Sequence, residues 1–380
     1  MNATTTLVPQ ADPGASYRAQ KAEIDAAVQR VLESGWYILG KEDAAFEHEF
    51  ADWLGAGTVA QHAVGCANGT DALVLALRGL GIGPGDTVVT VSHTAVATVA
   101  AIEMVGATPL LLDIDPDSYC MDPDELLSVL ESPPPGLPPI KAVIPVHLYG
   151  QACDLTRMLA ACDEAGVALI EDVSQAHGAT LNGRKLGTFG KIACFSLYPT
   201  KNLGALGDAG VVSTADEALA TDIGALRQYG WRERYISDMV GMNSRLDEIQ
   251  AAILRVKLTM LDANIARRRQ IAAAYDAALA DSELEVPVRL EGVEHAFHQY
   301  VLRSPNREDI QARLRAMGVA TGIHYPVPVH RQSAYVGRLA LGPAGCLETE
   351  AASREVFSLP LYPELTDAQV EQVCAALRTL

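Results

Sequence analysis

The chain has 380 residues, of which 29 are Lys or Arg and 47 are Asp or Glu, so its formal net charge is −18. A chain of this length can bury a large core, and it predicts two domains or one large domain with an appendage. The acidic balance repels phosphate backbones and anionic lipid, so we predict no nucleic-acid and no membrane partner. An anionic small substrate would need a locally basic site.

The seven cysteines are an odd number, are scattered among mostly apolar neighbours and form no Cys-x-x-Cys pair. This pattern predicts reduced thiols. The N-terminus lacks a basic segment followed by an apolar one, and no stretch reaches the roughly 18 apolar residues that a membrane span requires. We therefore expect a cytoplasmic protein.

Short apolar runs alternate with helical patterns between about residues 60 and 215. The expected strands are residues 62–66, 87–91, 109–114, 141–146, 167–171, 192–196 and 210–214. Alternation of this kind predicts an α/β fold with a mainly parallel central sheet flanked by helices. Several of the runs are continuously hydrophobic, which is typical of strands covered on both faces.

The segment from about residue 244 to 280 has apolar residues at spacings of three and four, which predicts one long amphipathic helix. A strand at 298–303, a helix at 307–317, another strand near 320–325 and a closing helix after residue 366 follow it. We therefore predict a large α/β domain with an N-terminal arm over residues 1–245. Residues 246–380 are predicted to hold an interdomain helix and a smaller C-terminal α+β domain.

The first polar motif follows the strand at 62–66. Asn68, Gly69 and Thr70 lie at the predicted N-terminus of a helix, where unpaired N–H groups and the helix dipole favour a phosphate. Capping of that helix by Asn68 or Thr70 explains the motif equally well. The sequence leaves both interpretations open.

The second motif ends the strand at 167–171. Ligands of open α/β sheets gather at the carboxyl ends of strands, so Asp172 is placed to meet one. Its carboxylate could hold a protonated ring nitrogen or a metal ion. His147, Asp172 and His177 show no recognised ligand spacing, so we predict no metal site. We expect His177 to be a core histidine with its hydrogen bonds satisfied.

The third motif, residues 194–210, runs from an apolar strand into Lys201 and a glycine-rich turn. Burying a charged ammonium is costly, so this lysine is either a solvated loop residue or a neutral amine, which is a nucleophile for carbonyls. Ser196, at the strand end, can donate to an anion. Phosphate donors, a carboxylate and a shielded lysine are together what pyridoxal 5'-phosphate requires of a protein.

These motifs resemble the DegT/StrS-type sugar-nucleotide aminotransferases, which have the fold type I architecture of aspartate aminotransferase. The likeness extends over nearly the whole chain, from residue 34 to residue 363. It rests on residues 34–40 (SGWYILG), 67–73 (ANGTDAL), 170–178 (IEDVSQAHG), 195–204 (FSLYPTKNLG), 207–208 (GD), 241–252 (GMNSRLDEIQAA), 325–326 (YP) and 359–363 (LPLYP).

The resemblance implies a role for each matching position. Lys201 would bind the cofactor's aldehyde, and Asp172 would pair with the pyridine nitrogen. The phosphate-binding positions are Gly69, Thr70 and Ser196, and Gln175 lies near the phenolic oxygen in such proteins. Asn243 matches a residue that reaches the phosphate from a neighbouring subunit, which implies a homodimer with shared active sites. A structural interpretation of Asn243 is a helix N-cap.

One position departs from the family. Its members often carry an aromatic residue that stacks on the pyridine ring where this chain has Ala95. An alanine cannot stack. His93, two residues earlier, could supply the stacking ring instead. The alternative is that His93 only lies next to a helix cap.

The resemblance implies transfer of an amino group from L-glutamate to a keto-sugar linked to a nucleoside diphosphate. Arg232 and Arg234 are candidates for binding its phosphates, unless they are solvated surface residues. His324 and Tyr325 are candidate sugar contacts, or else a buried strand end. Residues 34–40 and 243–248 are more similar to members that act on dTDP-3-keto-6-deoxyhexoses than on 4-keto sugars.

Three alternatives accompany this hypothesis. One is an aminotransferase for a 4-keto nucleotide sugar, and another is a non-catalytic regulatory protein that binds pyridoxal phosphate, because a fold does not fix a function. A third is dehydration, which family members perform with histidine in place of the lysine. Lys201 argues against dehydration.

Overall fold

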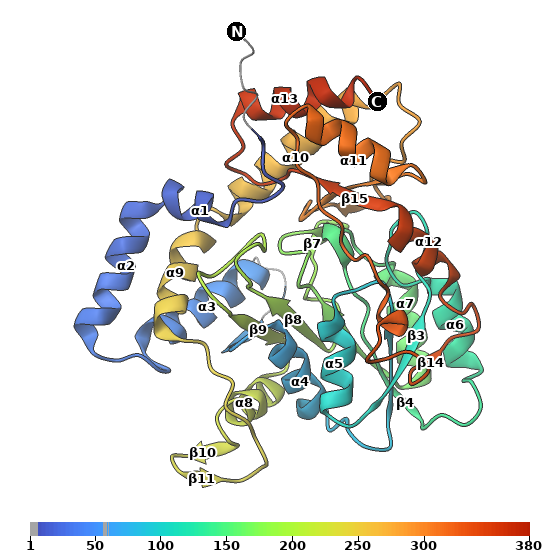
Figure 1. The fold of residues 1–380 in the computed structure, drawn as a ribbon. Helices are drawn as coiled ribbons and strands as arrows, with labels where there is room; N and C mark the ends of the chain where they lie inside the picture. The colour runs from blue at the N-terminus through green and yellow to red at the C-terminus, as the bar shows by residue number, and fades with distance from the viewer. Residues whose placement is uncertain (1–6, 56–58, 60) are drawn as a thin grey trace.

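The computed structural model describes residues 7–55, 59 and 61–380. Figure 1 shows the fold. The helices are α1 (Pro13–Ala19), α2 (Lys21–Ser34), α3 (Lys41–Gly55), α4 (Gly69–Gly79), α5 (Val96–Met104), α6 (Pro123–Glu131), α7 (Leu155–Ala165), α8 (Glu217–Leu226), α9 (Glu248–Leu258), α10 (Leu261–Ala278), α11 (Arg307–Ala316), α12 (Leu347–Glu355) and α13 (Asp367–Leu377). The strands are β1 (His62–Cys66), β2 (Thr87–Val91), β3 (Thr108–Leu112), β4 (Ile140–Val143), β5 (Ala168–Asp172), β6 (Thr180–Leu181), β7 (Arg184–Lys185), β8 (Ile192–Ser196), β9 (Gly210–Thr214), β10 (Trp231–Glu233), β11 (Ile236–Ser237), β12 (Val293–Glu294), β13 (Tyr300–Arg303), β14 (Ala340–Leu341) and β15 (Val356–Leu359).

Among the described residues, eight strands form a central sheet in the order β1-β9-β8-β5-β4-β2-β3-β14. Only β9 runs antiparallel to its neighbours in this sheet, pairing with β1 and β8. The other pairs are parallel. This arrangement confirms the mainly parallel sheet predicted from the apolar runs. Those at 62–66, 87–91, 192–196 and 210–214 have the predicted bounds, and the other three shift slightly at their ends.

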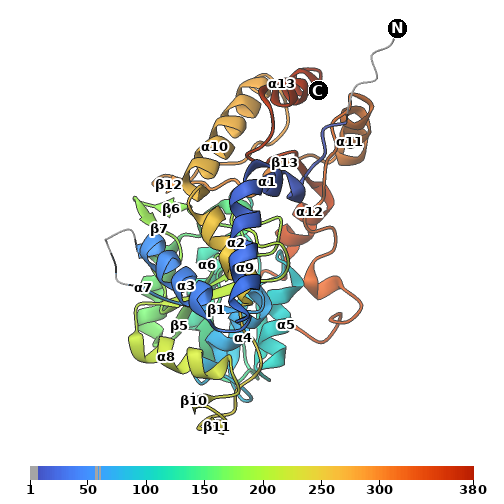
Figure 2. The same ribbon diagram turned by 90° about the vertical axis from the view of Figure 1, so that its left-hand side faces the viewer.

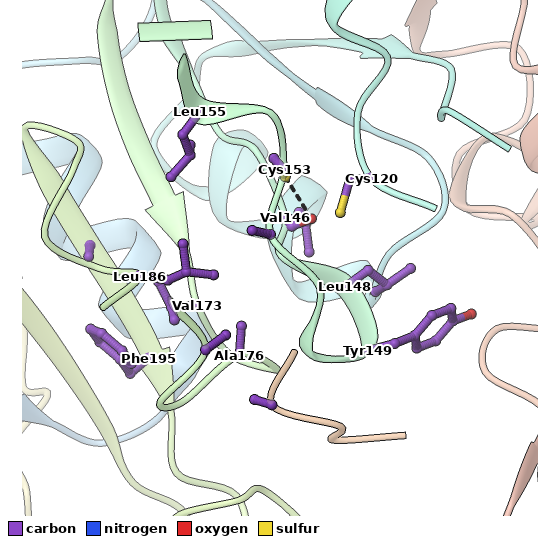
Figure 3. Packing of buried hydrophobic residues seen from close by; sticks show 14 of the residues in the cluster. Cys120, Val146, Leu148, Tyr149, Cys153, Leu155, Val173, Ala176, Leu186 and Phe195 are labelled. Carbon is purple, nitrogen blue, oxygen red and sulfur yellow. Dashed lines mark hydrogen bonds between the residues drawn. The ribbon is translucent and has the colours of Figure 1, made fainter. Parts of the chain in front are cut away.

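The sheet carries apolar side chains on both faces. Along β8, Ala193 and Phe195 belong to one core, whereas Ile192 and Cys194 belong to the other. Helices α3, α6, α7 and α9 contribute to the first core, and α4, α5 and α8 to the second. Figure 3 shows part of the first core, including Phe195. The continuous hydrophobic runs therefore reflect burial on both sides.

The predicted long helix is divided in two. Helix α9 ends at Leu258, and α10 begins at Leu261 after a turn at Thr259 and Met260. Helix α9 packs against α2 and α3, as Figure 2 shows, whereas α10 packs against α13. The apolar spacing continues across the turn, so the sequence pattern did not reveal it.

The C-terminal half also departs from the prediction in one element. Residues 320–325 form no strand and make only an isolated bridge from Gly322 to Ser358. The predicted division at residue 245 stays a prediction, and several contacts cross it besides the packing of α9 on α2 and α3. Strand β14 joins the central sheet beside β3, and Val8 of the N-terminal arm pairs with Val319. In the part of the chain that is described, no helix has the length and apolar character to span a membrane.

Candidate active site

The candidate active site is a cavity of about 690 Å³ at the carboxyl ends of β5 and β8. It is lined by the N-terminus of α4, the loop after β8, parts of α9 and α10, the N-terminal arm and residues 361–364. Strands β5 and β8 are adjacent and parallel, so their last residues, Asp172 and Ser196, open into the same space. This is where ligands of parallel sheets are expected to bind.

Lys201 lines this cavity on the loop that follows β8. Its backbone N–H donates to the carbonyl oxygen of Tyr198, 2.8 Å away, which closes a turn immediately before the lysine. Burial lowers the pKa of the Lys201 amine from 10.5 to about 8, although the charge of Asp172 acts in the opposite direction. A substantial fraction of the amine is therefore neutral near pH 8, as a carbonyl nucleophile requires.

Asp172 is buried and held on both carboxylate oxygens. Thr98 of α5 donates its hydroxyl to Oδ2 at 3.1 Å, and the backbone N–H of Ser174 donates to Oδ1 at 3.1 Å. Each oxygen keeps a lone pair for a further donor in the cavity. No sequence pattern pointed to Thr98, because only the packing of α5 against the sheet brings its hydroxyl to the end of β5.

The N-terminus of α4 combines a cap with open N–H groups. Asn68 accepts a hydrogen bond from the backbone N–H of Asp71 at 2.8 Å, so Asn68 is the N-cap. Gly69 and Thr70 line the cavity beside Ser196. A Cβ atom on Gly69 would lie 2.5 Å from the Cβ of Ser196, so glycine is needed for this close approach. The capping and anion-binding interpretations are therefore compatible.

Gln175, His324 and Tyr325 also line the cavity. Gln175 donates from Nε2 to the hydroxyl of Tyr325 at 2.8 Å and accepts from the backbone N–H of Tyr149 at 2.8 Å. Tyr149 in turn donates its hydroxyl to the carbonyl oxygen of His324. Burial raises the pKa of Tyr325 to about 12, so its hydroxyl stays protonated. These contacts join the end of β5 to the C-terminal part of the chain.

His93 does not reach the cavity, contrary to the hypothesis that it replaces the stacking ring. Its side chain is fully buried, and Nε2 lies 2.9 Å from the hydroxyl of Tyr149. Burial lowers the pKa of His93 to about 4. Ala95 lines the cavity instead. The strand end turns His93 into the core, which the sequence alone did not indicate.

Three further predicted residues lie away from the cavity within this chain. Arg232 forms an ion pair with Asp222, and the guanidinium of Arg234 lies 4.9 Å from the ring centre of Tyr235. Both are on the β10–β11 hairpin, which Figure 1 shows below α8 at the edge of the molecule. Asn243 is exposed and makes an isolated bridge with Gln228.

Asn243 is not a helix N-cap. Helix α9 begins at Glu248, with Asp247 at its N-cap position, so the predicted helix start was wrong by several residues. Asn243 lines a separate hollow together with Arg245, Asp247 and Gln250.

His177 is fully buried, as expected. Neither ring nitrogen makes a well-aligned hydrogen bond within the described residues, but the backbone of Ser196 interacts with the ring. Burial, together with the charge of Lys201, lowers the pKa of His177 to about 3, so the ring is neutral.

The donor set of this cavity fits pyridoxal phosphate. A partly neutral amine, a buried carboxylate and the open N–H groups of α4 beside a serine hydroxyl correspond to its aldehyde, ring nitrogen and phosphate. Lys201 would hold the aldehyde and Asp172 the ring nitrogen, and the open N-terminus of a helix suits the phosphate.

The same cavity holds three buried basic residues that the sequence analysis did not select. They are Lys257 of α9, Arg268 of α10 and His298. On a helical pattern, a lysine or arginine is read as part of a solvated face, so no sequence signal pointed to Lys257 or Arg268.

The chain matches known proteins over almost its whole length. A model of the DegT/DnrJ/EryC1/StrS aminotransferase family matches residues 18–378. The dTDP-3-amino-3,4,6-trideoxy-alpha-D-glucose transaminase of Streptomyces venezuelae is 42% identical over 99% of this chain and 97% of its own length. The UDP-2-acetamido-2-deoxy-3-oxo-D-glucuronate aminotransferase of Pseudomonas aeruginosa is 41% identical over 94% of this chain and 96% of its own.

Among solved structures, S. venezuelae DesV in complex with a ketimine intermediate superimposes with a TM-score of 0.92. It is 42% identical and covers 99% of this chain and 98% of its own. The likeness confirms the predicted fold type I architecture. The chain belongs to the DegT/DnrJ/EryC1/StrS aminotransferase family, as its motifs predicted, and is a pyridoxal phosphate-dependent aminotransferase.

Proposed function

We propose that the chain transfers an amino group from L-glutamate to the keto carbon of a dTDP-3-keto-6-deoxyhexose. The observation that carries the amino transfer is Lys201, an amine with a pKa of about 8 in the same cavity as the buried Asp172 and the N-terminus of α4. Membership of a family of sugar-nucleotide aminotransferases supports the class of substrate.

The chain's own residues divide the work. When bound, pyridoxal 5'-phosphate supplies an aldehyde and an electron-accepting ring. Lys201 removes a proton from the donor's α-carbon as a base and returns one as an acid. Asp172, fixed by Thr98 and Ser174, keeps the pyridine nitrogen protonated. Gly69, Thr70 and Ser196 would hold the phosphate, and Gln175, also at the cavity, would face the phenolic oxygen.

The names of two relatives support a keto group at C3 of the sugar. The S. venezuelae enzyme is named for a 3-amino sugar and the P. aeruginosa enzyme for a 3-oxo sugar. They share the position and differ in the nucleotide. This supports amination at C3, with His324 and Tyr325 as the sugar contacts at the cavity. The alternative remains a 4-keto nucleotide sugar.

We also propose a homodimer with shared active sites. Asn243 and the hairpin that carries Arg232 and Arg234 lie away from this chain's own cavity, and a second subunit would bring them to it. The hairpin region exposes large apolar side chains, which suits an interface. They are Tyr229, Tyr235, Ile236 and Val240.

The test is a pair of half-reactions followed by absorbance. L-glutamate should shift the cofactor band of the holoenzyme, and a 3-keto dTDP sugar added afterwards should restore it. Lys201→Ala should lack both changes. Restoration by the 4-keto sugar alone would overturn the C3 assignment. A cofactor-loaded protein that responds to no amino donor would instead support the non-catalytic alternative.

A further inference from the structure

Two buried cations line the side of the cavity formed by α9 and α10. Lys257 is 6% exposed and Arg268 is 5% exposed, and both are cavity residues. Burial lowers the pKa of Lys257 to about 8 and that of Arg268 to about 10, while the charge of Glu364 acts in the opposite direction on both. Glu364 also lines the cavity. Two cations therefore share one nearby carboxylate.

Their hydrogen bonds leave part of this positive charge without a partner. Lys257 donates from Nζ to the carbonyl oxygen of Gly204 at 2.6 Å. Arg268 donates from Nη1 to the carbonyl oxygens of Phe297, His298 and Leu361, at 3.1, 3.4 and 2.8 Å. Its Nε makes no hydrogen bond to the described residues. A guanidinium with unpaired N–H groups is well suited to bind a carboxylate.

The two cations line the same cavity as the reacting amine. Gly204, the acceptor of Lys257, is on the loop that carries Lys201. The charges of Lys201 and Arg268 both lower the pKa of His298, so this buried cavity residue lies within electrostatic reach of both. Nδ1 of His298 is also without a hydrogen-bond partner among the described residues.

We propose that Lys257 and Arg268 form a carboxylate subsite that binds the side-chain carboxylate of a dicarboxylic amino donor. This rests on the proposed function, in which such a donor presents its amino group at Lys201. Lys257 and Arg268 together carry more positive charge than Glu364 offsets, which leaves positive charge for the single negative charge of a carboxylate. The diphosphate of a nucleotide carries more negative charge, so Glu364 would repel it more strongly.

The experiment compares L-glutamate with L-glutamine, which has nearly the same shape but no side-chain charge. Lys257→Gln keeps a hydrogen-bond donor and removes the charge, and Arg268→Gln removes the guanidinium. The holoenzyme half-reaction is followed by absorbance, and kcat/KM is measured for each donor. The subsite predicts that kcat/KM for glutamate falls at least about tenfold in each variant, while that for glutamine hardly changes.

Arg267→Gln is the matched control. Arg267 precedes Arg268 on α10 but forms an ion pair with Asp367 and does not line the cavity. Arg267→Gln removes the same charge from the same helix. The ratio of kcat/KM for glutamate to kcat/KM for glutamine should therefore stay at the wild-type value. Should Arg268→Gln disrupt the fold, because its Nη1 holds several carbonyls, Lys257→Gln still decides the question.

Three results would overturn the subsite. An equal loss for glutamate and glutamine would show that both residues act on a feature the two donors share, either the α-carboxylate or the positioning of the Lys201 loop. An unchanged glutamate reaction with a raised KM for the nucleotide sugar would assign them to the diphosphate. Glutarate has no amino group to react, so its dissociation constant can be measured by calorimetry. We expect it to bind the wild-type holoenzyme more tightly than it binds the Lys257→Gln holoenzyme. Equal dissociation constants for the two proteins would also contradict the subsite.

These results separate the two proposals. A holoenzyme that binds glutarate through Lys257 but reacts with no amino donor would refute the proposed amino transfer and leave the anion site standing. A holoenzyme that transfers nitrogen from glutamate and glutamine equally well would refute only the subsite.

Discussion

Burial controls the reactivity of Lys201. Its pKa of about 8 means that the neutral amine predominates above that pH, whereas an exposed lysine is mostly charged until pH 10.5. We predict that the rate at which cofactor-stripped protein captures pyridoxal phosphate rises with pH and levels off above about 8. Stopped-flow absorbance at a series of pH values measures this rate. A rise that continues to a midpoint near 10.5 would mean that the amine is solvated in the cofactor-free protein.

The sequence predicted the residues that belong to strand ends and to the first turn of a helix. Asp172, Ser196 and Lys201 fall in the cavity because the ends of adjacent parallel strands meet at one edge of the sheet. His93 follows a strand as well, but its side chain enters the core. Lys257 is an example of the reverse error. Its position on an amphipathic helix looks solvated, and only the packing of α9 shows that it is buried.

Among the elements, α4 and β8 depend on one glycine for their close approach. In Gly69→Ala the new methyl group would clash with Ser196 and push the helix N-terminus away from the strand. We predict that the dissociation constant for pyridoxal phosphate rises at least about tenfold, because the phosphate donors no longer converge. Gly224→Ala on α8 is the control, since no atom lies within 4 Å of its Cβ position. Equal affinity in both variants would contradict this account of the phosphate site.

The end of β5 is also stabilised by hydrogen bonds to Glu171, the residue before Asp172. The buried carboxylate of Glu171 accepts hydrogen bonds from the backbone N–H groups of Gly187, Phe189 and Gly190 at 2.7–2.8 Å. Burial alone would raise the pKa of Glu171, but hydrogen bonds from His147 and the backbone hold it below 4.5. We predict that Glu171→Gln lowers the free energy of unfolding by about 1–3 kcal/mol at pH 7.

The pH dependence of this effect has a definite sign. A carboxyl group with a lowered folded-state pKa contributes stability above its unfolded value of 4.5, and the contribution is lost as the pH falls through the folded-state pKa. Urea unfolding of wild type and Glu171→Gln should therefore show a difference that is constant near neutral pH and shrinks below about 4.5. A difference that grows in acid would contradict the assignment.

The sequence pattern predicted strands that are buried on both faces, but it did not predict where the chain turns between two helices. Strand β8 has the predicted bounds because both of its faces are covered. The turn between α9 and α10 was missed, since Leu258 and Leu261 are both buried and keep the apolar spacing across it. Tertiary packing against different partners decides where that helix breaks.

For the whole molecule, the shared active site predicts complementation between two defective chains. Lys201→Ala lacks the amine, and Asn243→Ala lacks the residue that we propose reaches the neighbouring phosphate. A mixed dimer would hold one intact site, built from Lys201 of the second variant and Asn243 of the first. We predict that activity reappears when the two variants are unfolded together and refolded. No recovery in verified mixed dimers would show that each chain completes its own site.

The assignment of the active site to Lys201 can be tested without any substrate. Two lysines with pKa values of about 8, Lys201 and Lys257, line the same cavity, so either amine could in principle hold the cofactor's aldehyde. Borohydride reduction of the holoenzyme fixes the cofactor to the amine that holds it, and peptide mass spectrometry locates the modified residue. The account predicts modification of Lys201, with Lys257 unmodified. A cofactor fixed to Lys257, or to neither lysine, would contradict it.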